Sequence, residues 1–133
     1  MKKKVVIAGS ASLQPAIEKW MMYWNGREDA LVTNYPKPID QSRFLELYPG
    51  VHKEFFISLN DADILFIANE EKNGIEGYIG AETFAEIVYA LALNLTQGKS
   101  IEVILAKQPS ERIQASHEIQ LWLQLGWLTI FQV

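Results

Sequence analysis

Residues 64–86, with the sequence ILFIANEEKNGIEGYIGAETFAE, decide the fold of this chain. Their first five residues, 64–68, form the most apolar short segment of the chain, which is typical of a buried strand. A loop with three glycines follows, and residues 81–95 are then predicted to form a helix that is apolar on nearly all sides. Glycines let the backbone approach a ligand closely, and a helix start offers free N–H groups. This order of strand, loop and helix therefore predicts a ligand-binding unit.

Strand-like and helix-like segments alternate along the rest of the chain. The second expected helix contains Pro49 and Gly50, where we expect it to be interrupted or restarted. Alternation of this kind predicts an α/β, flavodoxin- or Rossmann-like three-layer fold in which residues 1–133 form a single domain. Its five-stranded parallel sheet should have the order 2-1-3-4-5 with right-handed crossovers. The expected strands are residues 4–8, 30–33, 63–68, 101–106 and 127–133, and the expected helices are residues 11–24, 42–59, 81–95 and 110–125.

The predicted strand order also indicates where a ligand would bind. The order reverses between the first and third strands, and such sheets bind ligands in the crevice at the carboxyl ends of those strands. The loops at that edge are Gly9-Ser10 and residues 69–80, so topology and composition indicate the same site. Gly9-Ser10 could hold a phosphate or sugar oxygen, or it could be a turn in which a serine caps the next helix. The chain has no Walker or dinucleotide glycine motif, so nothing specific supports either cofactor class.

The composition excludes several classes of function. A net charge of −4 argues against a nucleic-acid partner, which would favour a basic surface. The absence of cysteine excludes disulfides and thiolate catalysis. Only two histidines occur, His52 and His117, and they are far apart in the sequence, so we expect no metal site and no cofactor. No segment approaches transmembrane length, and the first apolar run is too short for a signal peptide, so we expect a cytoplasmic protein without membrane contact.

Glu86 is the leading catalytic candidate. It lies on the predicted helix opposite the main apolar stripe, yet its own neighbours on that side are apolar. An exposed glutamate is the ordinary interpretation, but a helix that is apolar on two sides is usually covered on both. Either a partner subunit or a ligand cleft would then cover Glu86, and Thr83, three residues earlier, could meet the same substrate. The expected main stripe contains Phe84, Ile87, Val88, Leu91 and Leu95.

Two short motifs resemble the signature of the nucleoside 2-deoxyribosyltransferase superfamily, which includes deoxynucleoside-monophosphate N-glycosidases. They are TFAEIVYA at residues 83–90 and GKSI at residues 98–101. The family pattern is Gly-Thr, two residues, Glu and then Gly-Tyr-Ala, followed later by Gly-Lys-Pro entering a strand. The order of elements agrees over most of the chain, whereas specific matches are confined to about residues 62–101. Glu82, Val88 and Ser100 stand where the family pattern has glycine, glycine and proline.

The resemblance implies cleavage or transfer of a (deoxy)ribosyl group at the N-glycosidic bond of a small nucleoside or nucleotide. It implies that Glu86 is the nucleophile that attacks the anomeric carbon C1, because a carboxylate can trap an oxocarbenium-like sugar. By the same resemblance, Thr83 would orient the carboxylate or a sugar hydroxyl, and the protein would be a homo-oligomer. The expected substrate-binding residues are Gly9, Ser10, Asn69, Gly80, Glu82 and Thr83.

Two other functions remain open for a chain of this fold. The first is a non-catalytic nucleotide- or sugar-binding domain that has kept the fold without the chemistry. The second is a phosphoacceptor signalling domain, which would require an aspartate at the end of the third strand. Because Ala68-Asn69 occupies that place, the second alternative is disfavoured.

Overall fold

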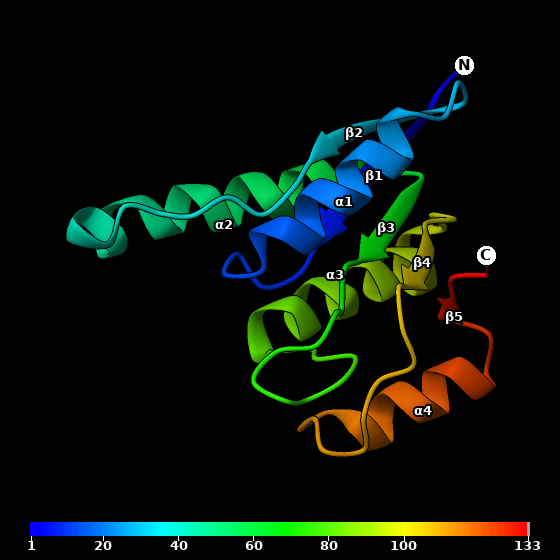
Figure 1. Ribbon diagram of the computed structural model, residues 1–133. Helices are drawn as coiled ribbons and strands as arrows, with labels where there is room; N and C mark the ends of the chain where they lie inside the picture. Colours follow the sequence, from blue (N-terminus) through cyan, green and yellow to red (C-terminus); the bar gives the residue numbers. More distant parts are fainter. Residues whose placement is uncertain (133) are drawn as a thin grey trace.

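The computed structural model describes residues 1–132, and in it five parallel strands form one sheet. Their spatial order is β2-β1-β3-β4-β5, which confirms the predicted α/β fold and strand order (Figure 1). β1 and β3 are paired from Val5 opposite Ile64 to Ala8 opposite Ile67, so the turn after β1 lies beside the loop after β3. The strands are β1 (Lys3–Ala8), β2 (Ala30–Asn34), β3 (Ile64–Ile67), β4 (Glu102–Leu105) and β5 (Thr129–Ile130).

Helices cover the two faces of the sheet unequally. One face packs against α1 through Trp20 and Trp24, whereas the other packs against α2, α3 and α4. Residues 5–8 of β1 and all of β3 are buried on both faces, which explains why these segments are continuously apolar. No helix within residues 1–132 has the length and hydropathy needed to cross a membrane. The helices are α1 (Gln14–Asn25), η1 (Gln41–Arg43, a 3₁₀ turn), α2 (Phe44–Asn60), α3 (Ala81–Gln97) and α4 (Ser116–Gln124).

The structure differs from the sequence-based prediction most clearly in α2, α4 and β5. The predicted interruption of α2 is wrong, because the helix continues through Pro49. Proline removes one helical N–H, but Leu45, whose carbonyl loses that donor, is exposed and accessible to water. α4 begins at Ser116 rather than at residue 110, because Ser110 instead forms a turn in which its Oγ accepts a hydrogen bond from the Arg112 N–H. β5 has only two residues, because it pairs with only Ile104 and Leu105 of β4; the predicted end at Val133 lies outside the described residues.

Candidate active site at the start of α3

α3 buries a stripe that is rotated relative to the predicted one. Val88 and Leu95, which were expected to face the core, are 40% and 61% exposed. Glu86, which was expected opposite the stripe, is only 5% exposed. The rotation arises because α3 is covered by the sheet on one side and by α2 on the adjacent side. The residues of α3 that are buried are Thr83, Glu86, Ile87, Ala90 and Leu91.

The side of α3 that carries Glu86 is covered by α2 of the same chain. Tyr89, one turn after Glu86, packs on Phe56 of α2 with ring centroids 4.8 Å apart. The Tyr89 hydroxyl also donates a 2.6 Å hydrogen bond to Asn60 Oδ1 at the end of α2. The second covered face was therefore correctly anticipated, and α2 of the same chain contributes this cover. A homo-oligomer stays a prediction from the resemblance, without support from this face.

A row of aromatic side chains on α2 borders Glu86. Neighbouring rings of this aromatic row have centroids 5.3, 5.2 and 4.4 Å apart. A spacing of four residues places such side chains on one helix face, so the pattern was visible in the sequence. What the sequence did not show is that this face meets α3 at Glu86. The members of the aromatic row are Phe44, Tyr48, His52 and Phe56.

The Glu86 carboxyl lies in an environment that disfavours its charge. Within residues 1–132 no hydrogen bond to this carboxyl is recorded, and burial together with the nearby Glu82 carboxylate raises its pKa to about 8. Glu86 is therefore largely protonated at neutral pH in the free protein. Burial raises the pKa of the Tyr48 hydroxyl as well, with further contributions from Glu82 and Glu86, which places this hydroxyl near both acids.

Glu82 and His52 complete the group of polar side chains around Glu86. Glu82 lies in the first turn of α3 with a side chain that is 57% exposed, and its Oε1 is 3.9 Å from His52 Nδ1. That nitrogen is buried and has no hydrogen-bond partner among the described residues. Glu82, which replaces a glycine of the family pattern, thus extends toward α2. Val88, the other glycine replacement in α3, is exposed and not part of the group.

A second group of predicted site residues forms where the turn after β1 meets the loop after β3. Lys72 Nζ donates a 2.9 Å hydrogen bond to Ser10 Oγ and lies 5.1 Å from the centroid of the Tyr78 ring. Gly9 has φ of 155°, and a Cβ there would lie 3.3 Å from the Ala68 carbonyl oxygen, so the position favours glycine. The topology-based expectation that these two loops meet is confirmed.

Gly80 lies in the chain between the loop that contains Lys72 and the helix turn that contains Glu86. It is the N-cap residue of α3, and a Cβ on it would stand 3.1 Å from the Tyr78 hydroxyl. Thr83 is 6% exposed and lies on the buried stripe, three residues before Glu86. No hydrogen bond or ion pair within residues 1–132 joins Ser10 or Lys72 directly to Glu86. The two groups are therefore successive parts of one edge of the sheet rather than one hydrogen-bonded network.

Asn69 holds two loops together. Its Oδ1 accepts a 3.1 Å hydrogen bond from the Lys107 N–H, and its Nδ2 donates a 2.8 Å bond to the Lys107 carbonyl. Nδ2 also lies 3.4 Å from the carbonyl oxygen of Gly77. The side chain is 1% exposed, so these contacts fix the loop after β3 against the segment after β4. Any role of Asn69 in substrate binding stays a prediction.

Replacing Asn69 with alanine is expected to lower the free energy of unfolding by about 2–4 kcal/mol. The substitution removes three hydrogen bonds and leaves partly buried backbone groups of Lys107 without partners. Urea unfolding followed by circular dichroism measures the change. Glu71→Ala, at an exposed position of the same loop, serves as the control and should cost about 1 kcal/mol or less. Equal effects of the two substitutions would contradict the bridging role of Asn69.

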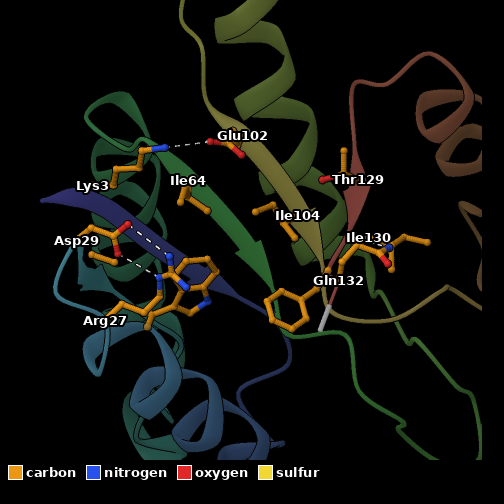
Figure 2. A pocket seen from close by; sticks show the side chains of 12 residues that line it. Lys3, Arg27, Asp29, Ile64, Glu102, Ile104, Thr129, Ile130 and Gln132 are labelled. Atoms are coloured by element: carbon orange, nitrogen blue, oxygen red, sulfur yellow. Dashed lines mark hydrogen bonds and ion pairs between the residues drawn. The ribbon is translucent and has the colours of Figure 1, made fainter.

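Two grooves lie away from the predicted site. The larger has a volume of about 390 Å³ and is lined by the first residues of all five strands, so it opens at the amino ends of the sheet (Figure 2). Figure 2 shows the ion pairs Lys3–Glu102 and Arg27–Asp29 at its rim. The other groove, of about 340 Å³, lies between the end of α3 and the segment after α4. Neither groove is lined by Glu86 or Gly9-Ser10, and parallel α/β sheets bind their ligands at the opposite edge.

The comparisons with known proteins add no family to this description. A scan against protein-family models and a search of curated proteins each found no match. The functional assignment therefore depends on the geometry of the start of α3 and on the resemblance of residues 83–90 and 98–101 to the motifs quoted above.

Proposed function

We propose that this protein cleaves or transfers a (deoxy)ribosyl group at the N-glycosidic bond of a nucleoside or nucleotide, with Glu86 as the nucleophile. The observation that carries the proposal is the buried Glu86 carboxyl without a recorded hydrogen bond, in the helix that returns from the carboxyl end of the central strand β3. Burying an acid without a partner costs free energy, and ionisable groups whose pKa is strongly shifted by burial are common in active sites. Its position also agrees with the motif glutamate of the resemblance.

The reaction divides into two displacements at C1 of the sugar. In the first, a Glu86 carboxylate oxygen bonds to C1 while the C1–N bond breaks, and its electron pair leaves with the base, which takes up a proton. In the second, another base or water attacks C1, the ester bond to Glu86 breaks, and the attacking group loses a proton. The carboxylate is restored, and the sugar has been transferred or hydrolysed.

The buried surroundings of Glu86 favour this chemistry. An oxocarbenium-like sugar carries positive charge, and a carboxylate attracts that charge more strongly in an apolar environment than in water. The proton that Glu86 holds at neutral pH must leave before attack, and the developing positive charge on the sugar lowers the free energy of that loss. Tyr48 and His52 lie beside the two glutamates and offer O–H and N–H donors to the departing base.

The other predicted residues have places consistent with substrate binding. Gly9 and Ser10, at the carboxyl end of β1, would lie on the 5′ side of the sugar. Gly80 precedes the N-terminus of α3, where free N–H groups favour an oxygen of the substrate. By the resemblance, Thr83 would orient the Glu86 carboxylate or a sugar hydroxyl, whereas Glu82, which stands where the family pattern has glycine, would narrow the site and add a charge. These roles are part of the proposal.

The test is release of free base from a panel of deoxynucleosides and their 5′-monophosphates, separated by chromatography in buffer with a chelator. Glu86→Gln is expected to reduce release by about 100-fold or more, because glutamine cannot attack C1. Glu118→Gln, at an exposed glutamate of α4, is the matched control and should retain full activity.

Two outcomes would contradict the proposal. Base release that Glu86→Gln leaves unchanged would remove Glu86 from the mechanism. No release from any substrate, with binding of nucleotides retained in calorimetry, would favour the non-catalytic binding domain that the sequence left open.

A further inference from the structure

We infer that His52 of α2, together with Glu82 and Glu86 of α3, forms a binding site for one divalent transition-metal ion such as Zn²⁺. Imidazole nitrogen and carboxylate oxygen are both ligands of zinc in proteins. The sequence indicated no such site because His52 stands 30 and more residues before the two glutamates. Packing of α2 against α3 brings the three side chains together.

The distances are within reach of those that a single ion requires. One ligand atom from each residue lies within 4.8 Å of the other two, and His52 Nδ1 is 3.9 Å from Glu82 Oε1. Zinc binds nitrogen and oxygen at about 2.0–2.2 Å, so two ligands of one tetrahedral ion lie about 3.4 Å apart. The ligand atoms must therefore approach one another by up to about 1.4 Å when the ion binds. The Glu82 side chain is free to contribute to this movement because it is 57% exposed.

Two of the three ligand groups are held in place before any ion binds. The His52 ring is stacked on Tyr48, with centroids 5.2 Å apart and planes 15° apart, and Phe56 contacts it from the next turn with an edge-on geometry. Glu86 is 5% exposed on the stripe that α3 buries. A site with fixed ligands loses less conformational entropy when the ion binds.

His52 also carries a polar atom that nothing else in residues 1–132 satisfies. Its Nδ1 is buried without a hydrogen-bond partner. Buried polar groups are nearly always paired, so an unpaired nitrogen that lies beside the carboxylates of Glu82 and Glu86 points to a missing ligand. A cation satisfies this nitrogen, because it accepts the lone pair of the imidazole, and it neutralises the Glu86 carboxylate.

The charge and ligand number indicate the class of ion. Two carboxylates and a neutral imidazole balance a charge of +2, so the occupied site is neutral overall. Three protein ligands leave a tetrahedral ion one open position, the arrangement found in zinc sites that bind water or substrate. The imidazole favours zinc or a related transition metal over Mg²⁺, which prefers oxygen ligands in an octahedral arrangement.

Metal binding is independent of the proposed glycosyl transfer, although the two share Glu86. If the proposed function holds, a bound ion occupies the carboxylate that would attack C1, and Zn²⁺ is expected to inhibit base release. This consequence rests on the proposed function, whereas the binding site itself rests on the geometry alone. The binding experiment therefore contains no substrate.

The site is tested by isothermal titration of the chelator-treated, dialysed full chain with ZnCl₂. We expect one ion per chain, and we expect His52→Ala, Glu82→Gln and Glu86→Gln each to weaken the affinity by about 10-fold or more. Titration with MgCl₂ should give no comparable binding. Co²⁺ provides a spectroscopic readout, because its visible absorption reports the coordination geometry and should be lost in the Glu86→Gln protein.

The second histidine of the chain provides the matched control. His117 is exposed on α4, so His117→Ala should leave the affinity for Zn²⁺ unchanged. Glu82→Gln alters a largely exposed side chain and should fold normally, so the test remains decisive if His52→Ala is unstable. Absence of saturable binding, unchanged affinity in the Glu82→Gln and Glu86→Gln proteins, or loss of affinity in His117→Ala would each overturn the inference.

Discussion

Replacing Glu86 with glutamine is expected to stabilise the folded protein at alkaline pH by several kcal/mol, although it removes the proposed nucleophile. Burial and the Glu82 carboxylate raise the pKa of Glu86 from 4.5 to about 8 on folding. Between these values the folded chain keeps a proton that the unfolded chain has lost. The free energy of unfolding therefore falls by about 1.4 kcal/mol per pH unit as pH rises between the two pKa values, and it stops falling above about 8. Glutamine has nearly the same shape and does not ionise, so it avoids this loss.

Urea unfolding at about pH 5 and about pH 9, with a chelator present, measures the effect. At the lower pH the wild-type and Glu86→Gln proteins should differ by only about 1 kcal/mol, because that pH lies only about half a unit above the pKa of 4.5 that Glu86 has in the unfolded chain. At the higher pH the variant should be the more stable. The exposed control Glu118→Gln should follow the wild type at both. Parallel stability curves for wild type and Glu86→Gln would show that the carboxyl is hydrated in the folded protein.

Replacing Gly77 with alanine is expected to destabilise the protein by about 3–5 kcal/mol. Gly77 has φ of 61°, and a Cβ there would overlap the carbonyl oxygen of Gln108 and stand 2.7 Å from Pro109 Cα. Both neighbours are backbone atoms, so the loop after β3 and the segment after β4 would have to separate. That movement would also disturb the hydrogen bonds through which Asn69 joins the same two segments.

Gly74→Ala separates this overlap from the effect of backbone conformation. Gly74 has φ of 78°, but a Cβ there would meet no atom within 4 Å. Its replacement should therefore cost only about 1–2 kcal/mol, the strain of a left-handed conformation. Denaturant unfolding of both variants makes the comparison. Equal losses would show that close packing at Gly77 is not what holds the two segments together.

Asn69→Ala and Gly77→Ala act on one part of the sheet edge that carries the candidate site, and Glu86→Gln acts on another. Gly77 and Asn69 determine the shape of the loop that leads from β3 to α3. Glu86 then determines the charge beside α2, where the catalytic proposal and the metal inference meet. If the loop variants lose base release while metal binding at His52 and Glu82 is kept, the two functions of this edge can be separated experimentally.

The sequence by itself determined the fold and the edge of the sheet that carries the candidate site. Residues 5–8 of β1 and all of β3 are continuous apolar runs followed within one residue by glycine or asparagine, and such runs form buried strands wherever helices cover both faces. Alternation with amphipathic helices, combined with right-handed crossovers, then leaves few possible strand orders. The meeting of Ser10 with the loop after β3 follows from that order. Glu86 was selected because a motif resemblance and an apolar flank both indicated it.

Only the tertiary structure decided what surrounds Glu86. The helical periodicity of α3 shows that two sides are apolar, but not which neighbour covers each side, so the buried stripe was placed on Val88 and Leu95 instead of Glu86. His52 gave no signal because its role depends on contact with a helix 30 residues later in the chain. The same reason applies to the continuous α2, since the exposure of Leu45, whose carbonyl loses its helical donor at Pro49, depends on where the helix packs. Local sequence patterns determine elements, whereas the pairing of helix faces is determined by long-range packing, which no short segment of sequence contains.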